Sequence, residues 1–297
     1  MKLFVFGRGY SASHFLRTHR GPFGQVCATT RGQEPPEPIS GVEDLVFDGH
    51  EAGSDVRARL GQADAMLVSI PPGGQIDPVL AHFATEIAAA PSLRSIVYLS
   101  TIGVYGDHGG AWVDESTVPA PRSARSIGRL KTENDWLKLG RDSGKAVHIL
   151  RLAGIYGPGQ NALENVRAGT ARRLIKPGQV FNRIHVEDIA RAIAAAFRYS
   201  GGGVWNVGDN EPAAPQDVIA YAAGLLGLPV PPGQDFDTAE LTPMARSFYS
   251  ENKRVSNQRL REVLGVELAY PNYREGIAAL AEGMGGKSLP VSCARAE

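Results

Sequence analysis

The amino terminus constrains the fold more than any other part of the sequence. The apolar run Lys2–Phe6 leads directly into Gly7-Arg8-Gly9-Tyr10-Ser11-Ala12, and a helix-type pattern follows as far as Arg20. This is the strand, G-x-G-x-x-A and helix order that a dinucleotide-binding turn requires. Gly7 permits the tight turn, Gly9 lets the backbone approach a pyrophosphate, and Ala12 lets the helix pack closely on the strand. Unpaired N–H groups at the helix start would hold the phosphates. We therefore expect the cofactor at Gly7, Arg8, Gly9, Tyr10, Ser11 and Ala12.

Apolar runs and helix-type segments alternate through the first half of the chain. The expected strands are Lys2–Phe6, Gln25–Thr29, Asp44–Phe47, Ala65–Ile70, Ser95–Leu99 and Ala146–Leu150. The expected helices are Tyr10–Arg20, Gly53–Leu60, Ile76–Ala89 and about Ala124–Arg141. Continuous apolar strands with helical crossovers predict a parallel sheet that is buried on both faces. Right-handed crossovers then give an α/β doubly wound Rossmann sheet.

The pattern changes after Leu152, where a loop rich in Gly and Pro begins. The elements expected after it are a strand at Arg183–Val186, a helix at Glu187–Tyr199, a strand at Val204–Val207, and helices at Ala214–Leu226, Val255–Leu264 and Asn272–Met284. We expect a dinucleotide-binding domain over residues 1–157, to which 183–208 return. Residues 158–182 and 209–284 would form a small C-terminal substrate subdomain. Residues 285–297 have no periodicity and are expected to be a disordered tail.

Composition excludes several classes of function. Lysine plus arginine and aspartate plus glutamate each number 31, so the clustered basic excess of a nucleic-acid binder is missing. The apolar runs are far shorter than a membrane span, and the amino terminus does not resemble a signal peptide. The two cysteines, Cys27 and Cys293, are expected to be unpaired thiols in the cytoplasm. No Cys/His cluster has metal-ligand spacing, so no metal is expected.

The segment after the second strand bears on the choice of cofactor. An acidic residue there would bind the ribose of NAD, whereas an arginine accepts the 2′-phosphate of NADP. This chain has no acid at that point and carries Arg31, and a guanidinium pairs well with phosphate oxygens. The prediction is therefore NADP, with NAD as the alternative. Asp48 would reach the adenine, and Ser69, Ile70 and Pro71 would run along the middle of the cofactor.

Five motifs in order resemble the extended short-chain dehydrogenase/reductase superfamily, of the epimerase/dehydratase type. They are Gly7–Ala12, Leu99–Gly106, Arg151–Gly159, Arg183–Asp188 and Trp205–Gly208. Together they span most of the chain. The segment Trp112–Glu115, followed by Ile127-Gly128-Arg129, is similar to the atypical branch of that superfamily.

The resemblance implies roles for particular residues. Thr101 matches the hydroxyl residue that bonds the reacting oxygen, and Lys131 matches the lysine that binds the nicotinamide ribose. Gly154 and Ile155 would lie near the nicotinamide. The family has a tyrosine four residues before that lysine, where this chain has Ile127, and an isoleucine cannot transfer a proton. The neighbouring Ser126 is a much weaker donor that breaks the spacing to Lys131.

The proton donor is therefore left open between Tyr105, Tyr156 and Lys131. We expect an oxidoreductase that acts on a small carbonyl, hydroxyl or nucleotide-sugar-like substrate, and Arg246 and Lys253 could bind an anionic one. The alternative is a non-catalytic protein that senses NADP(H), which the missing tyrosine favours. The resemblance also implies a possible homodimer.

Overall fold

The central feature of the computed structural model is a seven-stranded parallel sheet. The structure describes residues 1–32, 37–74 and 76–284. The strands of the sheet are β1 Lys2–Phe6, β2 Gln25–Thr30, β3 Val42–Val46, β4 Ala65–Val68, β5 Ser95–Thr101, β7 Ala146–Leu152 and β11 Gly203–Val207. They lie in the order β11-β7-β5-β4-β1-β2-β3. The parallel register, such as Val5 opposite Ala28 and Leu67, confirms the predicted doubly wound Rossmann fold.

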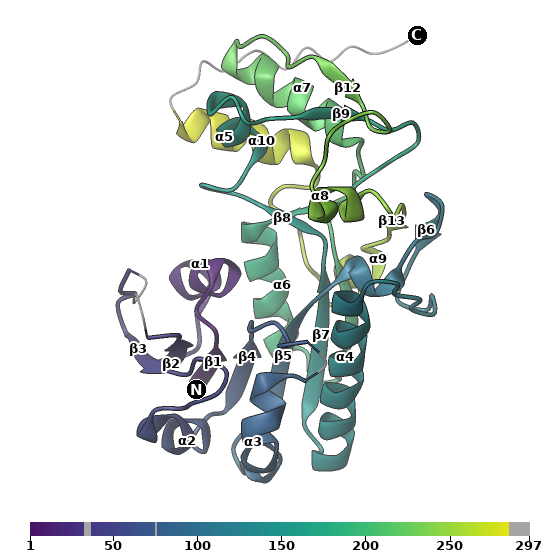
Figure 1. Cartoon of the computed structure of the whole chain (residues 1–297). Helices are drawn as coiled ribbons and strands as arrows, with labels where there is room; N and C mark the ends of the chain where they lie inside the picture. Colours follow the sequence, from purple (N-terminus) through teal and green to yellow (C-terminus); the bar gives the residue numbers. More distant parts are fainter. Residues whose placement is uncertain (33–36, 75, 285–297) are drawn as a thin grey trace.

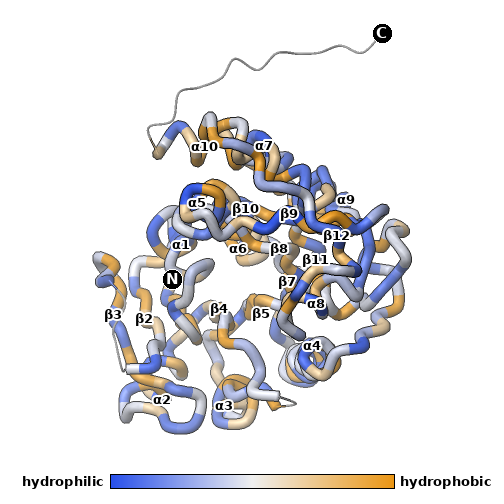
Figure 2. Tube along the Cα trace, turned by 45° about the horizontal axis from the view of Figure 1, so that its top comes forward, coloured by the Kyte–Doolittle hydropathy of each residue, from blue (hydrophilic) through white to orange (hydrophobic). Residues whose placement is uncertain are grey.

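Helices cover both faces of the sheet (Figure 1). They are α1 Tyr10–Thr18 and α6 Val186–Arg198 on one face, and α2 Ser54–Leu60, α3 Pro78–Ala89 and α4 Ala124–Ser143 on the other. Figure 2 shows the strands in a row between these two layers. Each layer has its own apolar core: Phe15 and Ile193 belong to the first, and Phe83 and Trp136 to the second. Burial of such side chains from both layers is what holds a parallel sheet together.

A second group of helices lies above the sheet in Figure 1. It consists of α5 Ala162–Arg167, α7 Pro215–Leu226 and α10 Tyr273–Gly283. These three share a separate core that includes Leu163, Ala222 and Ile277. The proposed boundaries of a substrate subdomain at 158–182 and 209–284 stay a prediction. The expected disordered tail at 285–297 lies outside the described residues, as does Cys293.

Short elements complete the part of the chain that the structure describes. They are the 3₁₀ helix η1 Ile102–Tyr105, the strands β6 Trp112–Val113, β8 Gly154–Tyr156, β9 Arg173–Ile175, β10 Arg183–His185, β12 Gly233–Asp235 and β13 Arg254–Val255, and the helices α8 Pro243–Phe248 and α9 Gln258–Glu262. The predicted helix Val255–Leu264 is wrong at its start. Val255 is part of β13, where it is opposite Val113 and donates its N–H to Asn182, and the helix begins only at Gln258.

Two expected absences can be examined in the described residues. None of the helices there is long and apolar enough to cross a membrane. The described His, Cys, Asp and Glu side chains include no group of three or more that could hold a metal ion.

Candidate active site

The turn between β1 and α1 has the shape of a phosphate cradle. Gly7 has a φ of +88°, and a Cβ at this position would lie 2.7 Å from the side chain of Ile70. Only glycine therefore fits, as the motif predicts. Gly9 caps α1 without any side-chain hydrogen bond, and a Cβ built on it would meet no described atom within 4 Å. The first N–H groups of α1 thus have no side-chain cap and the space beside Gly9 is open, so these residues fit a pyrophosphate.

Arg8 points away from that open space. Its side chain is buried, its Nε lies 2.7 Å from Asp44 Oδ1, and its Nη2 donates to Asp44 Oδ2 at 2.8 Å. Its Nη1 donates to the Glu37 carbonyl at 2.7 Å. The Arg8 guanidinium is thus bound to β3 and to the segment before it. Arg31, in contrast, is exposed at the end of β2. Of the two arginines predicted to contact phosphate, Arg31 is the one whose side chain is accessible.

The other predicted cofactor residues follow the ends of β3 and β4. Asp48 is exposed, and its carboxylate accepts the N–H groups of Glu51 and His50, which lowers the pKa of Asp48. Ser69 donates its N–H to Phe6 O at 2.8 Å, so β1 and β4 end side by side. Ile70 reaches Gly7, and Pro71 is exposed next to it. All of them lie at the carboxyl edge of the sheet. Their roles toward a cofactor stay predictions.

Tyr10 connects the cradle with the loop after β8. Its hydroxyl donates to Pro158 O at 3.0 Å, and a Cβ on Gly157 would lie 2.6 Å from that hydroxyl oxygen. The Gly-rich loop after residue 152 therefore comes close to the first turn of α1. The sequence predicted Tyr10 at the cofactor and Gly154 and Ile155 near the nicotinamide, but not a contact between the two segments.

A cavity of about 760 Å³ lies at the same edge of the sheet. Its lining comes from the ends of β5, β8 and β10, the start of α4, and the segment 247–253. The lining residues are Thr101, Ile102, Gly103, Arg122, Ser123, Arg125, Ser126, Gly154, Ile155, Tyr156, Val180, Phe181, Asn182, Arg183, Ser247, Phe248, Ser250, Glu251 and Lys253. In open α/β sheets, ligands bind beyond the carboxyl ends of the strands, where this cavity lies. It brings together Thr101, Gly154 and Ile155 with Tyr156 and Lys253, the possible proton donor and the possible substrate-binding cation.

Two predicted catalytic residues lie outside that lining. Tyr105 is fully buried, and its hydroxyl donates to Asn206 Oδ1 at 2.8 Å. Lys131 keeps 55% of its side chain exposed and pairs with Asp135 at 2.7 Å on the same helix. Ile127, one turn earlier, is 47% exposed. Helix residues spaced by four share a face, so Ile127 and Lys131 look outward together while Ser126 lines the cavity.

Tyr156, the other tyrosine considered as a proton donor, does line the cavity. Its ring is 6% exposed and packs edge-on against His185, with centroids 5.1 Å apart. Burial raises the pKa of the Tyr156 phenol. Its hydroxyl lies against α10, since a Cβ on Gly276 would be 2.1 Å away from it. The apolar part of the ring therefore faces the cavity and the hydroxyl points behind the wall.

A buried ionic network that the sequence analysis missed fixes α4 to the sheet. Arg151 on β7 donates to Glu133 on α4, with Nη2 2.7 Å from Oε2, and Ser100 Oγ donates to Glu133 Oε1 at 2.5 Å. The Glu133 side chain is 1% exposed and that of Arg151 is 6% exposed. Arg151 also lies 4.8 Å from the centre of the Tyr105 ring. The available signal was Arg151, a charged residue within the otherwise apolar strand β7.

The cavity lining carries an excess of positive charge. Lys253 is neutralised, since its Nζ lies 2.6 Å from Glu251 and donates to Gly106 O at 2.7 Å. Arg122 is largely exposed and 3.9 Å from Asp107. Arg125 is exposed at the cavity rim. Arg183 is packed into the wall, where burial lowers its pKa. Arginines rather than Lys253 are therefore the cations available to an anionic ligand.

Arg246, the other cation considered for an anionic substrate, is outside the cavity lining. Its Nη2 donates to Ala239 O at 3.1 Å, and its guanidinium lies 5.1 Å from the centre of the Phe236 ring. These contacts hold the segment around α8 together.

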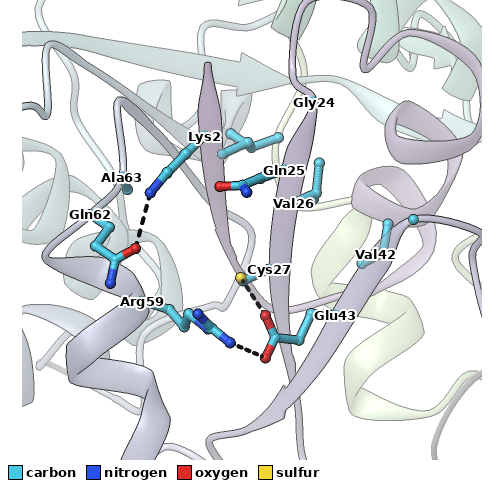
Figure 3. Close-up of a pocket in the computed structure, with 12 residues that line it drawn as sticks. Lys2, Gly24, Gln25, Val26, Cys27, Val42, Glu43, Arg59, Gln62 and Ala63 are labelled. Atoms are coloured by element: carbon cyan, nitrogen blue, oxygen red, sulfur yellow. Dashed lines mark hydrogen bonds and ion pairs between the residues drawn. The ribbon is translucent and has the colours of Figure 1, made fainter.

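A second cavity, of about 500 Å³, lies at the opposite end of β1 and β2 (Figure 3). Glu43 lines this cavity, and its carboxylate accepts hydrogen bonds from the Cys27 thiol at 3.3 Å and from Arg59 at 2.9 Å. Burial, together with Glu43, raises the pKa of Cys27 to about 11. This thiol is therefore protonated and unreactive near neutral pH. None of the predicted site residues lines this cavity.

Comparisons with known proteins bear on the family and the fold. The model of the NAD-dependent epimerase/dehydratase family matches residues 80–208. Protein YeeZ from Escherichia coli K12 is 30% identical over 231 residues, which cover 74% of this chain and 76% of YeeZ. A conserved protein of unknown function from Silicibacter pomeroyi has a solved structure with 49% identity and a TM-score of 0.85, and the match covers 95% of this chain and 99% of that one. The MoeE5 structure with UDP-glucuronic acid and NAD has a TM-score of 0.75 at 21% identity, covering 96% and 99% of the two chains. That likeness concerns the fold alone.

Proposed function

This chain belongs to the NAD-dependent epimerase/dehydratase family, and on that premise we propose that it is an NADP(H)-dependent oxidoreductase. Its substrate would be a small carbonyl or hydroxyl compound or a nucleotide-sugar-like molecule. The observation that carries the proposal is that Thr101, Gly154 and Ile155 line one cavity at the sheet edge where the glycine turn lies. The Thr101 hydroxyl, which would polarise an oxygen, therefore lines the same cavity as backbone that a nicotinamide could approach.

The cofactor would be held by the glycine turn and by the strand ends beside it. Gly7, Gly9 and the first N–H groups of α1 would take the pyrophosphate, and Ile70 would support the turn. Tyr10, Ser11 and Ala12 belong to the same first turn. When bound, a reduced nicotinamide supplies a hydride to a carbonyl carbon. Thr101 would polarise the carbonyl oxygen, and Lys131 would bind the nicotinamide ribose.

The preference for NADP rests on Arg31. Its side chain is accessible at the end of β2, whereas the Arg8 guanidinium is already paired with Asp44. A 2′-phosphate would therefore find its cation at Arg31.

Arginines at the rim of the cavity support an anionic substrate. Arg122 and Arg125 are exposed there, and Glu251 is neutralised by Lys253. MoeE5, which shares the fold, was solved with UDP-glucuronic acid. A nucleoside diphosphate sugar carries the negative charge that these arginines could bind.

Turnover with a defined panel tests the proposal. NADPH oxidation and NADP⁺ reduction would be followed with aldehydes, ketones, alcohols and UDP-sugars. We expect at least one substrate, and Thr101→Val and Lys131→Ala should each lower its kcat/KM by about tenfold or more. Arg141→Ala, at the far end of α4, serves as the matched control. Unchanged turnover in both site variants would contradict the catalytic assignment.

A second candidate function is a non-catalytic sensor of NADP(H). The outward-facing Ile127 favours it, because the family's proton donor is missing from that position. Tight NADPH binding without turnover of any panel member would support the sensor and contradict the enzyme.

We further propose a cytoplasmic location and a homodimer. The Cys27 thiol, which has no disulfide partner among the described residues, supports a reducing compartment. The family resemblance supports a dimer contact through α3 and α4, which pack side by side here.

A further inference from the structure

The start of α4 presents a hydroxyl to the substrate cavity one residue before Ile127. Ser126 lines the cavity and is 8% exposed, whereas Ile127 is outside the lining. A Cβ built on Gly103 would lie 3.0 Å from Ser126 Oγ and 3.4 Å from Thr101 Oγ1. The two hydroxyl oxygens therefore both lie close to the position that a Gly103 Cβ would occupy.

The hydrogen bonds around Ser126 fix the direction in which its own proton points. Ser123 Oγ accepts the N–H of Ser126 at 3.1 Å, as the cap of α4. Ser123 Oγ–H then donates to Ser126 Oγ at 3.0 Å. The Ser126 oxygen is thus occupied as an acceptor, and among the described residues its proton has no acceptor. It is left for a group in the cavity.

Thr101 is arranged in the same way. Its Oγ1 accepts the N–H of Gly103 at 3.1 Å, and its proton also has no acceptor among the described residues. Both residues line the same cavity, so two hydroxyl donors are available there to a carbonyl oxygen, which has two lone pairs.

We propose that Ser126, together with Thr101, binds the reacting oxygen of the substrate and that Ser126 delivers the proton that Ile127 cannot. The inference rests on the proposed function. As the carbonyl carbon gains a hydride from a reduced nicotinamide dinucleotide, which is thereby oxidised, the C=O π bond opens and the oxygen takes the Ser126 proton. Ser126 takes the proton of Ser123 at the same time, and Ser123, which is exposed, takes one from water, which leaves as hydroxide. Each hydroxyl gives and receives one proton, so no alkoxide accumulates, and oxidation runs the same path in reverse.

The binding part is tested without turnover, using trifluoroacetamide as an unreactive carbonyl probe. Its ¹⁹F relaxation would be titrated with parent protein, with and without NADPH. We expect saturable binding to the parent, weakened about threefold to tenfold by Ser126→Ala and by Thr101→Val, which is the range of one lost hydrogen bond. Ser126→Thr, which keeps the hydroxyl, should retain binding.

Ile127→Ala is the control, because the neighbouring side chain points out of the cavity. Failure of the parent to bind the probe overturns the proposal, as does equal affinity in Ser126→Ala and parent. If Ser126→Ala and Ser126→Thr both lose probe binding because both variants unfold, their thermal transitions will show it. In that case Thr101→Val decides: weaker binding supports the oxygen site, and unchanged binding rejects it.

The proton path is tested with 4-nitrobenzaldehyde and NADPH. Ser126→Ala and Ser123→Ala should both lower kcat, and the solvent deuterium isotope effect of the parent should fall in both variants. A normal isotope effect in Ser123→Ala rejects the path through Ser123. NADPH binding without reduction of the aldehyde by the parent contradicts the proposed function instead, while the trifluoroacetamide titration still decides the role of Ser126.

Discussion

Asp209 is an acidic residue whose surroundings disfavour its charged form. It follows β11, is 3% exposed, and accepts one hydrogen bond, from the N–H of Glu211 at 3.1 Å to Oδ1. Among the described residues its Oδ2 has no partner. Burial raises the pKa of Asp209 to about 7. The folded protein therefore holds this proton at pH values where the unfolded chain has already lost it.

This shift has a defined sign in the pH dependence of stability. Between about pH 4 and pH 7 the folded state binds more protons at Asp209 than the unfolded state, so its contribution to stability falls as pH rises. Asp209→Asn cannot ionise, and we expect it to be more stable than the parent at pH 8 and similar to it at pH 4. Urea unfolding at both pH values measures this, with the exposed Asp142→Asn as control. A variant that loses stability equally at both pH values would contradict the assignment.

At the scale of elements, α4 matters because it delivers Ser123 and Ser126 to the cavity lining. The pair Glu133–Arg151 joins this helix to β7, and Ser100 adds β5 to the contact. Removing one partner of a buried pair leaves an uncompensated charge. We expect Glu133→Ala to lower the free energy of unfolding by about 3–5 kcal/mol. Asp142→Ala, which removes one partner of an exposed ion pair on the same helix, should lower the free energy of unfolding by less than about 1 kcal/mol. Chemical denaturation of both variants makes the comparison, and equal small losses would show that the pair does not anchor α4.

The long elements of this fold were predictable, and the short ones were not. Apolar runs such as Lys2–Phe6 and Ala65–Val68 appear as strands because their own side chains fill the core. The two-residue strands β6 and β13 exist only because Trp112–Val113 lies beside Arg254–Val255, far away in sequence. The periodicity of a short sequence window does not predict pairing between segments that are far apart in the chain.

The same difference applies to the site. The glycine turn was predictable because its backbone demands glycine at one position, and Gly7 indeed adopts a φ of +88°. Which face of α4 meets the cavity depends on how the helix sits on the sheet, so the sequence pointed to Ile127 and Lys131 while Ser126 lines the cavity. The pairing of Arg8 with Asp44 is likewise a contact between distant segments.

At the scale of the whole molecule, the strand order places the two parts of the site together. The glycine turn follows β1 and the cavity begins at the end of β5, with only β4 between these strands. The helices α5, α7 and α10 lie above this edge (Figure 1). One sheet edge thus carries the glycine turn, the hydroxyls of Thr101 and Ser126 and a cavity lined by arginines, which supports the proposed hydride transfer to a bound substrate.

The most direct test of the account is a fluorescence titration of the purified protein with NADPH and, separately, with NADH. We predict that NADPH binds at least about tenfold more tightly, a difference of about 1.4 kcal/mol. Arg31→Ala should remove most of this difference without changing the affinity for NADH, and the exposed Arg141→Ala should leave both affinities unchanged. Equal or tighter binding of NADH would contradict the role of Arg31, and failure to bind either dinucleotide would contradict the function itself.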